Sequence, residues 1–374
     1  MQNSRTIFVF HVLRNYAPSN LNRDEDGGPK YAFFGGVQRG RISSQSLKRS
    51  VRLSEPFDVF RDDGLIDIRT RYLPLLMKEA LENRGVDNAA IADIVGKLQE
   101  LGKSEKKATT DSAGEEQGKK GKELKPFATK QLIRCAPTTI AALCDQLLAL
   151  RASDSWKLNL EKVIRPIDVY GVDTALFGSM TTSAAFSNVN SACQVSHAIS
   201  VNRSAYGKDF FTAVDDYDGE SAMVGGGKDA LQFTSNCYYW TVAVSVPLLL
   251  NNLQGEVDMV KCVMQSLIES LFVAHPSGKQ TTFFSMPAAS LVIAEKRRTA
   301  MDYANAFEDP VSPIEGKSLV RNAIDTLAAY ISKVDVVYAQ AVERRHVGLF
   351  DVEIPQSEQL ASWENVAQWV TNNL

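Results

Sequence analysis

The chain has 374 residues, of which 44% are hydrophobic and 23% charged, and its formal net charge is −3 at pH 7. This balance is typical of a soluble protein with one large core or with two or three domains. A slightly acidic chain has no overall field that attracts nucleic acid, so any such site must be a local concentration of cations. The longest apolar run, at 242–250, is too short to span a bilayer, and the N-terminus lacks the pattern of a signal peptide. We therefore expect a cytoplasmic protein without a membrane segment.

The cysteines give no sign of a disulfide framework or a metal site. There are five, without a CxxC pair: Cys135, Cys144, Cys193, Cys237 and Cys262. The odd number and the wide spacing fit neither extracellular disulfides nor a zinc site. We expect these cysteines to be small buried hydrophobic residues in a reducing cytoplasm. We also expect no bound metal and no cofactor.

The N-terminal part predicts a strand and a long loop. Residues 6–13 are apolar and β-branched and predict a buried strand. We expect its His11 to be a core residue and not a catalytic one, because no partner acid or nucleophile is near it in sequence. Residues 15–36 are dominated by Pro, Asn and Gly, which predicts a loop long enough to be functional. The loop carries the cations Arg23 and Lys30 and the acids Asp24, Glu25 and Asp26.

The most informative stretch is 39–52, RGRISSQSLKRSVR. It contains no acid and five cations: Arg39, Arg41, Lys48, Arg49 and Arg52. Ser43 and Ser44 are preferred residues at a helix start, and the spacing of Leu47 and Val51 predicts a buried stripe. A helix start with amides, hydroxyls and cations is a natural phosphate site. The alternative interpretation is a basic amphipathic helix on the protein surface.

Residues 55–170 predict an interrupted helical region. Helical periodicity covers 73–101 and returns at 129–151. Between them, 103–125 is a Lys/Glu/Gly/Ser/Thr tract without an apolar stripe, which predicts a disordered excursion. Its lysines are balanced by glutamates, so we do not interpret it as an RNA-binding arm. From residue 167 onwards we expect strands and glycine turns.

A strand at 195–201 precedes a long excursion at 202–232 that is rich in turn-forming residues and predicts an extended hairpin. Phe210 and Phe211 lie in it, beside a lysine. Adjacent aromatic residues near a cation are typical of a wedge that stacks on nucleic-acid bases. The alternative is that the two phenylalanines only anchor the hairpin.

The C-terminal part predicts a central strand at 233–250, a helix at 256–273, a short strand at 290–294 and two closing helices at 319–331 and 358–370. Together with the N-terminal strand and the basic helix, this is the element order of a split βαβ sheet of ferredoxin type. The sequence therefore predicts an α+β fold. That fold has many functions, so the order alone assigns none.

Several short blocks resemble those of the CasC family, the backbone subunit of the type I-E CRISPR surveillance complex, Cascade. The blocks are SNLNRDE (19–25), FGG (34–36), RISSQSLKR (41–49), ALFGSM (175–180), SHAIS (196–200), DFFTAVDD (209–216) and GKQTTFF (278–284). They cover residues 1–54 and roughly 167–290 in the same order as in the family. Residues 55–165 and the C-terminus are similar only in length and character.

The resemblance implies a palm like an RNA-recognition motif, an inserted helical fingers domain and a β-hairpin thumb. The palm would comprise 1–54, 167–201 and 233–374 with the C-terminal helices, the fingers 55–166, and the thumb 202–232. It also implies a non-catalytic subunit whose copies form a helical filament on a CRISPR guide RNA (crRNA) and display it to a target DNA strand in antiviral defence. The implied partners are further copies and the large, small, repeat-processing and guide-handle-binding Cascade subunits.

The resemblance also implies which residues touch RNA, and it implies no catalytic or metal-binding residue. Arg23, Lys30, Ser43, Gln45, Lys48 and Arg52 match positions at guide phosphates, a contact that suits a variable guide because it ignores sequence. Arg41 and Arg49 join this group from the basic stretch. Met180 matches a wedge near a kink in the guide, Phe210 and Phe211 match thumb residues that enter the guide–target duplex, and Lys279 and Gln280 match a palm segment near the RNA.

Two other functions fit some of the residues. A metal-dependent ribonuclease backbone subunit would use Asp24 and Asp26 in the loop, with Glu25 between them, because clustered carboxylates can hold Mg²⁺ against phosphates. No histidine or other general base accompanies them. A purely structural assembly protein would leave the basic residues without a nucleic-acid partner.

Overall fold

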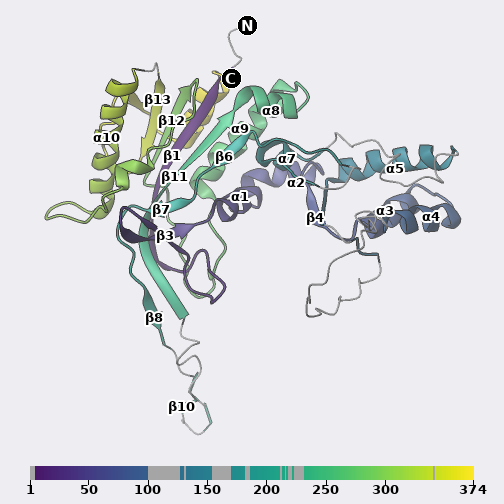
Figure 1. The fold of residues 1–374 in the computed structure, drawn as a ribbon, viewed down its shortest axis with the longest axis horizontal. Helices are drawn as coiled ribbons and strands as arrows, with labels where there is room; N and C mark the ends of the chain where they lie inside the picture. The colour runs from purple at the N-terminus through teal and green to yellow at the C-terminus, as the bar shows by residue number, and fades with distance from the viewer. Residues whose placement is uncertain are drawn as a thin grey trace, which may run out of the picture. The chain divides into compact units, whose positions relative to one another are not determined.

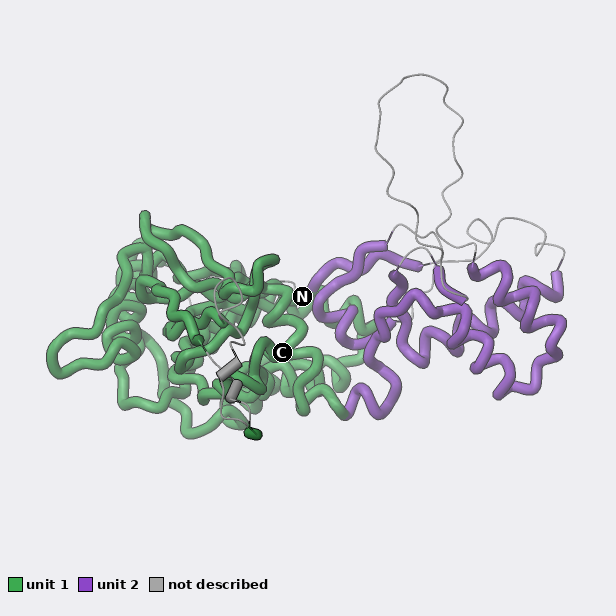
Figure 2. Tube along the Cα trace, turned by 90° about the horizontal axis from the view of Figure 1, so that it is seen from below, with its two compact units in different colours: residues 1–58, 192–374 green, residues 59–191 purple. Residues whose placement is uncertain are grey.

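The computed structural model describes residues 5–99, 127–129, 132–153, 170–181, 186–210, 213–214, 216–217, 221–222, 231–339 and 342–374. The predicted excursion at 103–125 and Phe211 lie outside these ranges. The chain forms two compact units: unit 1 comprises Met1–Asp58 with Ala192–Leu374, and unit 2 comprises Val59–Ser191 (Figure 2). The predicted boundaries, at 54 and 166, differ from these. Each unit is described here by itself.

Unit 1 is built on a large, mostly antiparallel sheet with the strand order β14-β13-β12-β1-β11-β7-β3-β2 (Figure 1). Its strands are β1 (Ile7–Ser19), β2 (Tyr31–Phe34), β3 (Val37–Ile42), β7 (Ala198–Ser200), β11 (Leu231–Ser245), β12 (Leu291–Arg297), β13 (Glu343–Gly348) and β14 (Ser357–Gln359). Two short strands, β6 (Cys193–Val195) and β8 (Gly207–Asp209), also pair with β11. Only the pairing of β13 with β14 is parallel among the described strands of this sheet.

The predicted N-terminal strand is confirmed and is longer than expected. β1 lies between β11 and β12, and the side chains of Phe8, Phe10 and Leu13 are fully buried. The strand continues to Ser19, where a loop was predicted. Its register against β11 shifts between Tyr16 and Ser19, around Pro18, because proline has no amide to donate to the ladder.

Helices cover both faces of the sheet. Those of unit 1 are α1 (Ser44–Arg52), α8 (Val246–Asn252), α9 (Val257–Val273), α10 (Leu319–Tyr338) and α11 (Trp363–Thr371), with short 3₁₀ turns at Glu55–Phe57 and Ala304–Phe307. Trp369 of α11 packs edge-on against Phe8, whereas the apolar face of α10 packs with Leu13. Residues 8 and 13 point to opposite faces because side chains alternate along a strand. α9 packs against α11 and α1.

Unit 2 is mainly helical. Its elements are α2 (Asp58–Asp62), which begins at the last residue of unit 1, β4 (Ile68–Thr70), α3 (Leu73–Asn83), α4 (Asn88–Leu98), β5 (Ile133–Cys135), α5 (Pro137–Arg151) and α7 (Val172–Phe177). The strands β4 and β5 pair antiparallel. The three long helices enclose an apolar core formed by residues such as Met77, Ile94 and Leu147.

The α+β class is confirmed, but several predicted elements differ. Of the predicted helical stretch 73–101, residues 73–99 are described and form two helices, α3 and α4, because the chain turns at Gly85 with φ +70°. α5 begins only at Pro137, since proline favours the first turn of a helix. Residues 246–252 form α8 where the strand was predicted to continue, and Pro247 again lies in the first turn.

Other elements were missed or misplaced. Residues 172–177 form a helix where strands were predicted, residues 196–197 separate β6 from β7 inside the predicted strand, and α10 extends seven residues beyond 331. β13 was not predicted, and residues 357–359 form a strand before α11. In the predicted hairpin, β9 (Ala213–Val214) pairs with β10 (Ser221–Ala222). Four cysteines are buried as expected, but Cys262 is exposed on α9.

Candidate nucleic-acid interface

The basic helix α1 begins where the sequence predicts. Ser43 is its N-cap and accepts a hydrogen bond at Oγ from the amide of Ser46 (3.3 Å), while its own amide donates to Oδ1 of Asn22 (2.9 Å). Leu47 and Val51 are buried. Gln45 and Arg49 are exposed, and Lys48 and Arg52 are half-buried. The buried Ser43 hydroxyl therefore serves the helix cap, and among the cations of the helix Arg49 is the exposed one.

Lys30 and Arg41 lie at the start of the same helix. The amide of Arg41 donates to the carbonyl of Lys30 (2.9 Å), and Arg41 Nη1 lies 3.5 Å from Nδ1 of His197. The amide of Ser44, in the first turn of α1, donates to the same Nδ1 (3.3 Å). The structure thus brings two predicted cations and the N-terminal end of α1 together on unit 1. It adds His197, which is 153 residues from Ser44 in the sequence and accepts a hydrogen bond from the Ser44 amide.

His197 has no role in the sequence analysis beyond its place in the SHAIS block. Partial burial and the charges of Arg41 and Lys30 lower the pKa of His197. Because its Nδ1 accepts hydrogen bonds, the ring is neutral at this position. Its place between two cations depends on the pairing of β7 with β3, which local sequence patterns do not reveal.

The loop that carries Arg23 has a defined internal structure. Asp24 Oδ1 accepts hydrogen bonds from the amides of Asp26 (3.1 Å) and Gly28 (2.9 Å), and residues 23 and 29 form a β-bridge. The Asp24 carboxylate therefore closes its own loop. Within the described ranges, no group of three or more His, Cys, Asp or Glu side chains is arranged to hold a metal ion.

The GKQTTFF segment packs on this loop. Gly278 is so close to the loop that a Cβ atom there would lie 2.3 Å from the Leu21 carbonyl oxygen. The Gln280 side chain donates to the carbonyls of Pro276 (3.0 Å) and Ser285 (3.2 Å) and accepts from the Ser285 amide (2.9 Å). Gln280 thus holds its own segment together, and its neighbour Lys279 is the residue of this pair that remains a candidate for contact with RNA.

A hollow of about 260 Å³ lies between the exposed side of α1 and the residues after α9. Ser46 and Arg49 of α1 and Leu53 just after it line one side, and His275 and Met286 line the opposite side. Arg49 therefore lies at a concave part of the surface.

His275 makes the stability of this region depend on pH. Burial and the nearby charge of Arg14 lower its pKa from 6.5 to about 4. As the pH falls from 6.5 to 4, the unfolded chain binds the proton first, so the folded state loses stability. We expect His275→Gln to remove this part of the pH dependence in urea denaturation. An unchanged pH profile in the variant would contradict the assignment.

Phe210 follows β8 directly and is 55% exposed, while Phe211 lies outside the described residues. β8 pairs with the start of β11, so Phe210 is at the base of the predicted hairpin. A second exposed aromatic group, which was not predicted, places Tyr31 in edge-on contact with Phe33 and Tyr206. The alternation of aromatic residues along β2 is the signal that could have revealed it.

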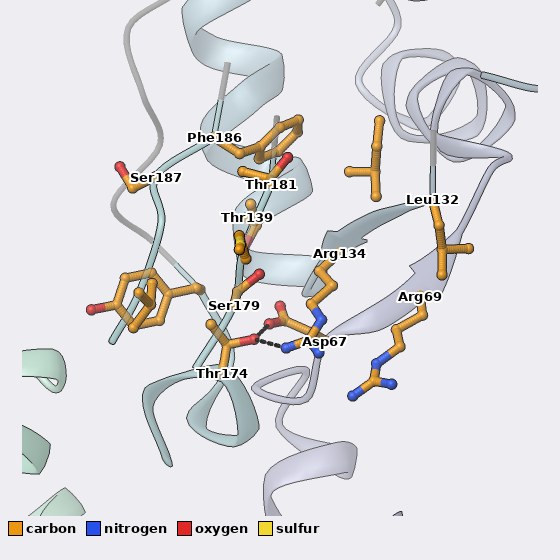
Figure 3. Close-up of a pocket in the computed structure, with 14 residues that line it drawn as sticks. Asp67, Arg69, Leu132, Arg134, Thr139, Thr174, Ser179, Thr181, Phe186 and Ser187 are labelled. Carbon is orange, nitrogen blue, oxygen red and sulfur yellow. Dashed lines mark hydrogen bonds between the residues drawn. The ribbon is translucent and has the colours of Figure 1, made fainter. Parts of the chain in front are cut away.

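Met180 belongs to unit 2, whereas Lys30, Arg41 and α1 belong to unit 1. Its side chain is 85% exposed and lines a pocket of about 240 Å³ (Figure 3). Arg134 Nη1 donates to the Gly178 carbonyl (2.7 Å) and lies within hydrogen-bond distance of the Thr174 hydroxyl (3.3 Å). The Thr174 hydroxyl donates to Asp67, whose pKa is raised by burial and by Asp173.

Comparison with known proteins identifies a family. A model of the CT1975-like protein family matches residues 9–371. No curated protein matches the chain significantly. A solved chain described as "CRISPR RNA-guided surveillance complex, pre-nicking" is 24% identical with a TM-score of 0.80, over 98% of this chain and 99% of that one. Another, "CRISPR RNA-guided surveillance complex", is 19% identical with a TM-score of 0.70, over 98% and 100%. At these identities the solved structures show a shared fold.

Among the described residues, no helix combines the length and the apolar character that crossing a bilayer requires.

Proposed function

The chain belongs to the CT1975-like protein family, which is CasC-like, and from this membership we propose that it is a guide-RNA-binding backbone subunit of a Cascade-type complex. The membership confirms the family that the sequence blocks indicated. In this proposal the subunit has no catalytic activity of its own. It holds the guide so that base pairing, and not the protein, reads the target DNA.

One observation carries the proposal. Lys30, Arg41 and the first turn of α1 meet on one side of unit 1, and the cations of α1 continue from there. Cations that converge at a helix start in this way suit a phosphate backbone, which is the part of a guide that does not vary. A chain with a net charge of −3 needs such a local concentration to bind RNA.

The order of strands and helices supports the assignment of a palm, a fingers domain and a thumb. The central strands lie in the order β12-β1-β11-β7, with α1 between β1 and β7 along the chain and α9 between β11 and β12. This order supports a ferredoxin-like palm. In this proposal the helical unit 2 corresponds to the fingers domain, expected at 55–166, and the excursion at 202–232 is the thumb. Two solved relatives are described as RNA-guided surveillance complexes, which supports guide RNA and further Cascade subunits as partners. We propose further copies of this chain as partners on the CasC-like sequence blocks.

We propose the type I-E subtype and a cytoplasmic location on the CasC-like sequence blocks. Target DNA is a partner through its pairing with the guide. The ribonuclease alternative loses support because Asp24 already binds two amides of its own loop.

The test of the proposal is the double variant Lys48→Ala/Arg52→Ala. We expect RNA affinity to fall at least about tenfold, and the slope of log affinity against log salt to become shallower by about 0.7 per lost phosphate contact. The loss should be similar for unrelated RNA sequences. Fluorescence anisotropy over a salt series measures both quantities.

The matched control is Arg298→Ala/Lys333→Ala, which removes two exposed cations from unit 1 outside α1. Both double variants change the net charge equally, so a general field effect would weaken binding equally in both. Equal affinities and equal salt slopes in the two variants would remove α1 from the RNA site. Thermal unfolding of each variant checks that the fold is intact.

A further inference from the structure

Three segments of unit 1 that carry candidate RNA contacts meet at one place, although they are far apart in the sequence. The segments are the loop at 20–30 with Arg23 and Lys30, the base of the predicted thumb with Phe210, and the stretch at 278–284 with Lys279. Each of them contacts the other two through side chains or backbone that carry no charge. These contacts therefore set the distances between the candidate RNA contacts.

The loop is attached to the thumb base by hydrogen bonds. The Asn20 side chain is 2% exposed, and its Nδ2 donates to the carbonyls of Gly27 in the loop and Gln232 in β11, both at 3.0 Å. Just before β8, on the other strand of the thumb base, the Tyr206 hydroxyl donates to the Pro29 carbonyl (3.2 Å). Both strands of the thumb base are therefore fixed to the loop.

The Phe233 ring joins the thumb base to the third segment. Phe233 is directly opposite Gly207 in the pairing of β11 with β8, and a Cβ atom at Gly207 would overlap the ring. A ring that covers a cross-strand glycine packs closely on the backbone. The same ring contacts Phe283, with 5.6 Å between ring centroids and 44° between ring planes, and such aromatic pairs are stabilising. Gly278, five residues before Phe283, packs on the loop at the Leu21 carbonyl.

We infer that Asn20 and Phe233 are positioning residues for RNA binding, which hold the loop, the thumb base and the 278–284 segment at fixed separations. The inference deepens the proposed function and rests on it. Cations bind successive phosphates best when they are already correctly spaced, because segments that become ordered only on binding reduce the affinity. Asn20 acts without touching RNA, since it is buried and both of its donors are used within the protein.

The variants Asn20→Ala and Phe233→Leu test the inference, and fluorescence anisotropy of a labelled single-stranded RNA over a salt series is the measurement. We expect each folded variant to bind RNA about tenfold more weakly than the wild type, although no cation has been removed. The salt slope should become shallower by about 0.7 for each cation that leaves its phosphate. Phe233→Leu keeps an apolar side chain on Gly207 so that the variant folds. Phe233→Tyr keeps the ring and should retain the affinity of the wild type.

The matched control is Trp369→Leu, which also removes one aromatic contact from unit 1. Trp369 of α11 packs edge-on against Phe8 of β1 with 5.7 Å between ring centroids. Urea denaturation should show a loss of stability in this variant as in Phe233→Leu. Under conditions where both are folded, the control should keep the RNA affinity and the salt slope of the wild type. A purely structural Phe233 would behave as the control does.

The outcomes separate this inference from the proposed function. If RNA binding depends on Lys48 and Arg52, but folded Asn20→Ala and Phe233→Leu bind like the wild type, the inference is overturned and the proposed function stands. Equally weak binding by Phe233→Tyr and Phe233→Leu would overturn the role of the ring. A wild-type chain that binds no RNA overturns both the inference and the proposed function.

Discussion

Replacing Glu295 with glutamine is expected to lower the free energy of unfolding by about 3–5 kcal/mol, the usual cost of breaking a buried ion pair from one side. Glu295 lies in β12 and is fully buried. Its two oxygens accept hydrogen bonds from Arg344 Nε and Arg297 Nη1, both at 2.7 Å, and from the Tyr303 hydroxyl at 3.0 Å. The neutral variant leaves two guanidinium groups in the core without the anion that they share.

Urea denaturation of the variant and of Glu358→Gln measures this effect. Glu358 makes an ion pair with Arg345 at 3.0 Å but is exposed, so its replacement should cost about 1 kcal/mol or less. The comparison separates the loss of a buried anion from the loss of any carboxylate. Similar midpoints for the two variants would show that the Glu295 cluster contributes little to stability.

The same cluster makes the stability of the fold depend on pH in the acid range. Burial alone would raise the pKa of Glu295, but His11, whose Nε2 lies 3.4 Å from the carboxylate, and the two arginines outweigh it, and the pKa lies well below 4.5. The ionised carboxylate therefore stabilises the fold fully above pH 4.5, and this contribution is lost as the pH falls below that value. Glu295→Gln should remove the corresponding acid sensitivity.

For His11, which belongs to this cluster, the sequence predicted the burial but not the partner. Its prediction as a core residue is confirmed, since it is 1% exposed and stacks on Tyr303 with ring centroids 4.4 Å apart. That prediction rested on the absence of an acid near His11 in the sequence, but an acid does lie near it in the fold. The Glu295 carboxylate lies 3.4 Å from its Nε2 because β1 pairs with β12. Strand pairing over such sequence distances is not encoded in a local pattern.

The elements that were predicted correctly are those whose formation depends on nearby residues in the sequence. The apolar run of β1, the buried stripe of α9 and the Ser43 cap of α1 need only their own residues, and all three are present. Short elements were missed because they depend on partners elsewhere. β13 has few apolar residues and forms against β12, and α7 is a single short helix within a glycine-rich segment.

Some of the basic residues are exposed and others are fully buried, and the composition does not show which are which. A cation on a polar stretch is usually exposed, yet Arg14 and Arg344 are fully buried. Arg14 donates to the carbonyls of Leu271, Phe272 and Ala274 and so caps the end of α9. The candidate site was predictable as a basic helix and a family signature. The place of His197 in this site could be seen only in the fold, because it depends on the pairing of β7 with β3.

Arg39 belongs with the buried cations, although the sequence counts it in the basic stretch, and Arg39→Lys is expected to lower the free energy of unfolding by about 2–4 kcal/mol. Arg39 is fully buried in β3. Its Nη1 donates to the carbonyls of Ser200 and Val201, both at 2.9 Å, and its Nη2 donates to those of Phe307 and Glu308, both at 2.8 Å. It thereby joins β3 to β7 and to the 3₁₀ turn at Ala304–Phe307.

Lysine keeps the charge but cannot reproduce a planar fork that reaches four carbonyls, so some of these oxygens lose their partner. The variant therefore separates structure from RNA binding. Under conditions where it is folded, its salt slope for RNA should equal that of the wild type, because Arg39 is buried and touches no phosphate. Arg49→Lys, an exposed position on α1, is the control and should leave stability unchanged. A shallower salt slope in Arg39→Lys with unchanged stability would instead show that Arg39 contacts RNA. Its hydrogen bonds to the four carbonyls would then not stabilise the fold.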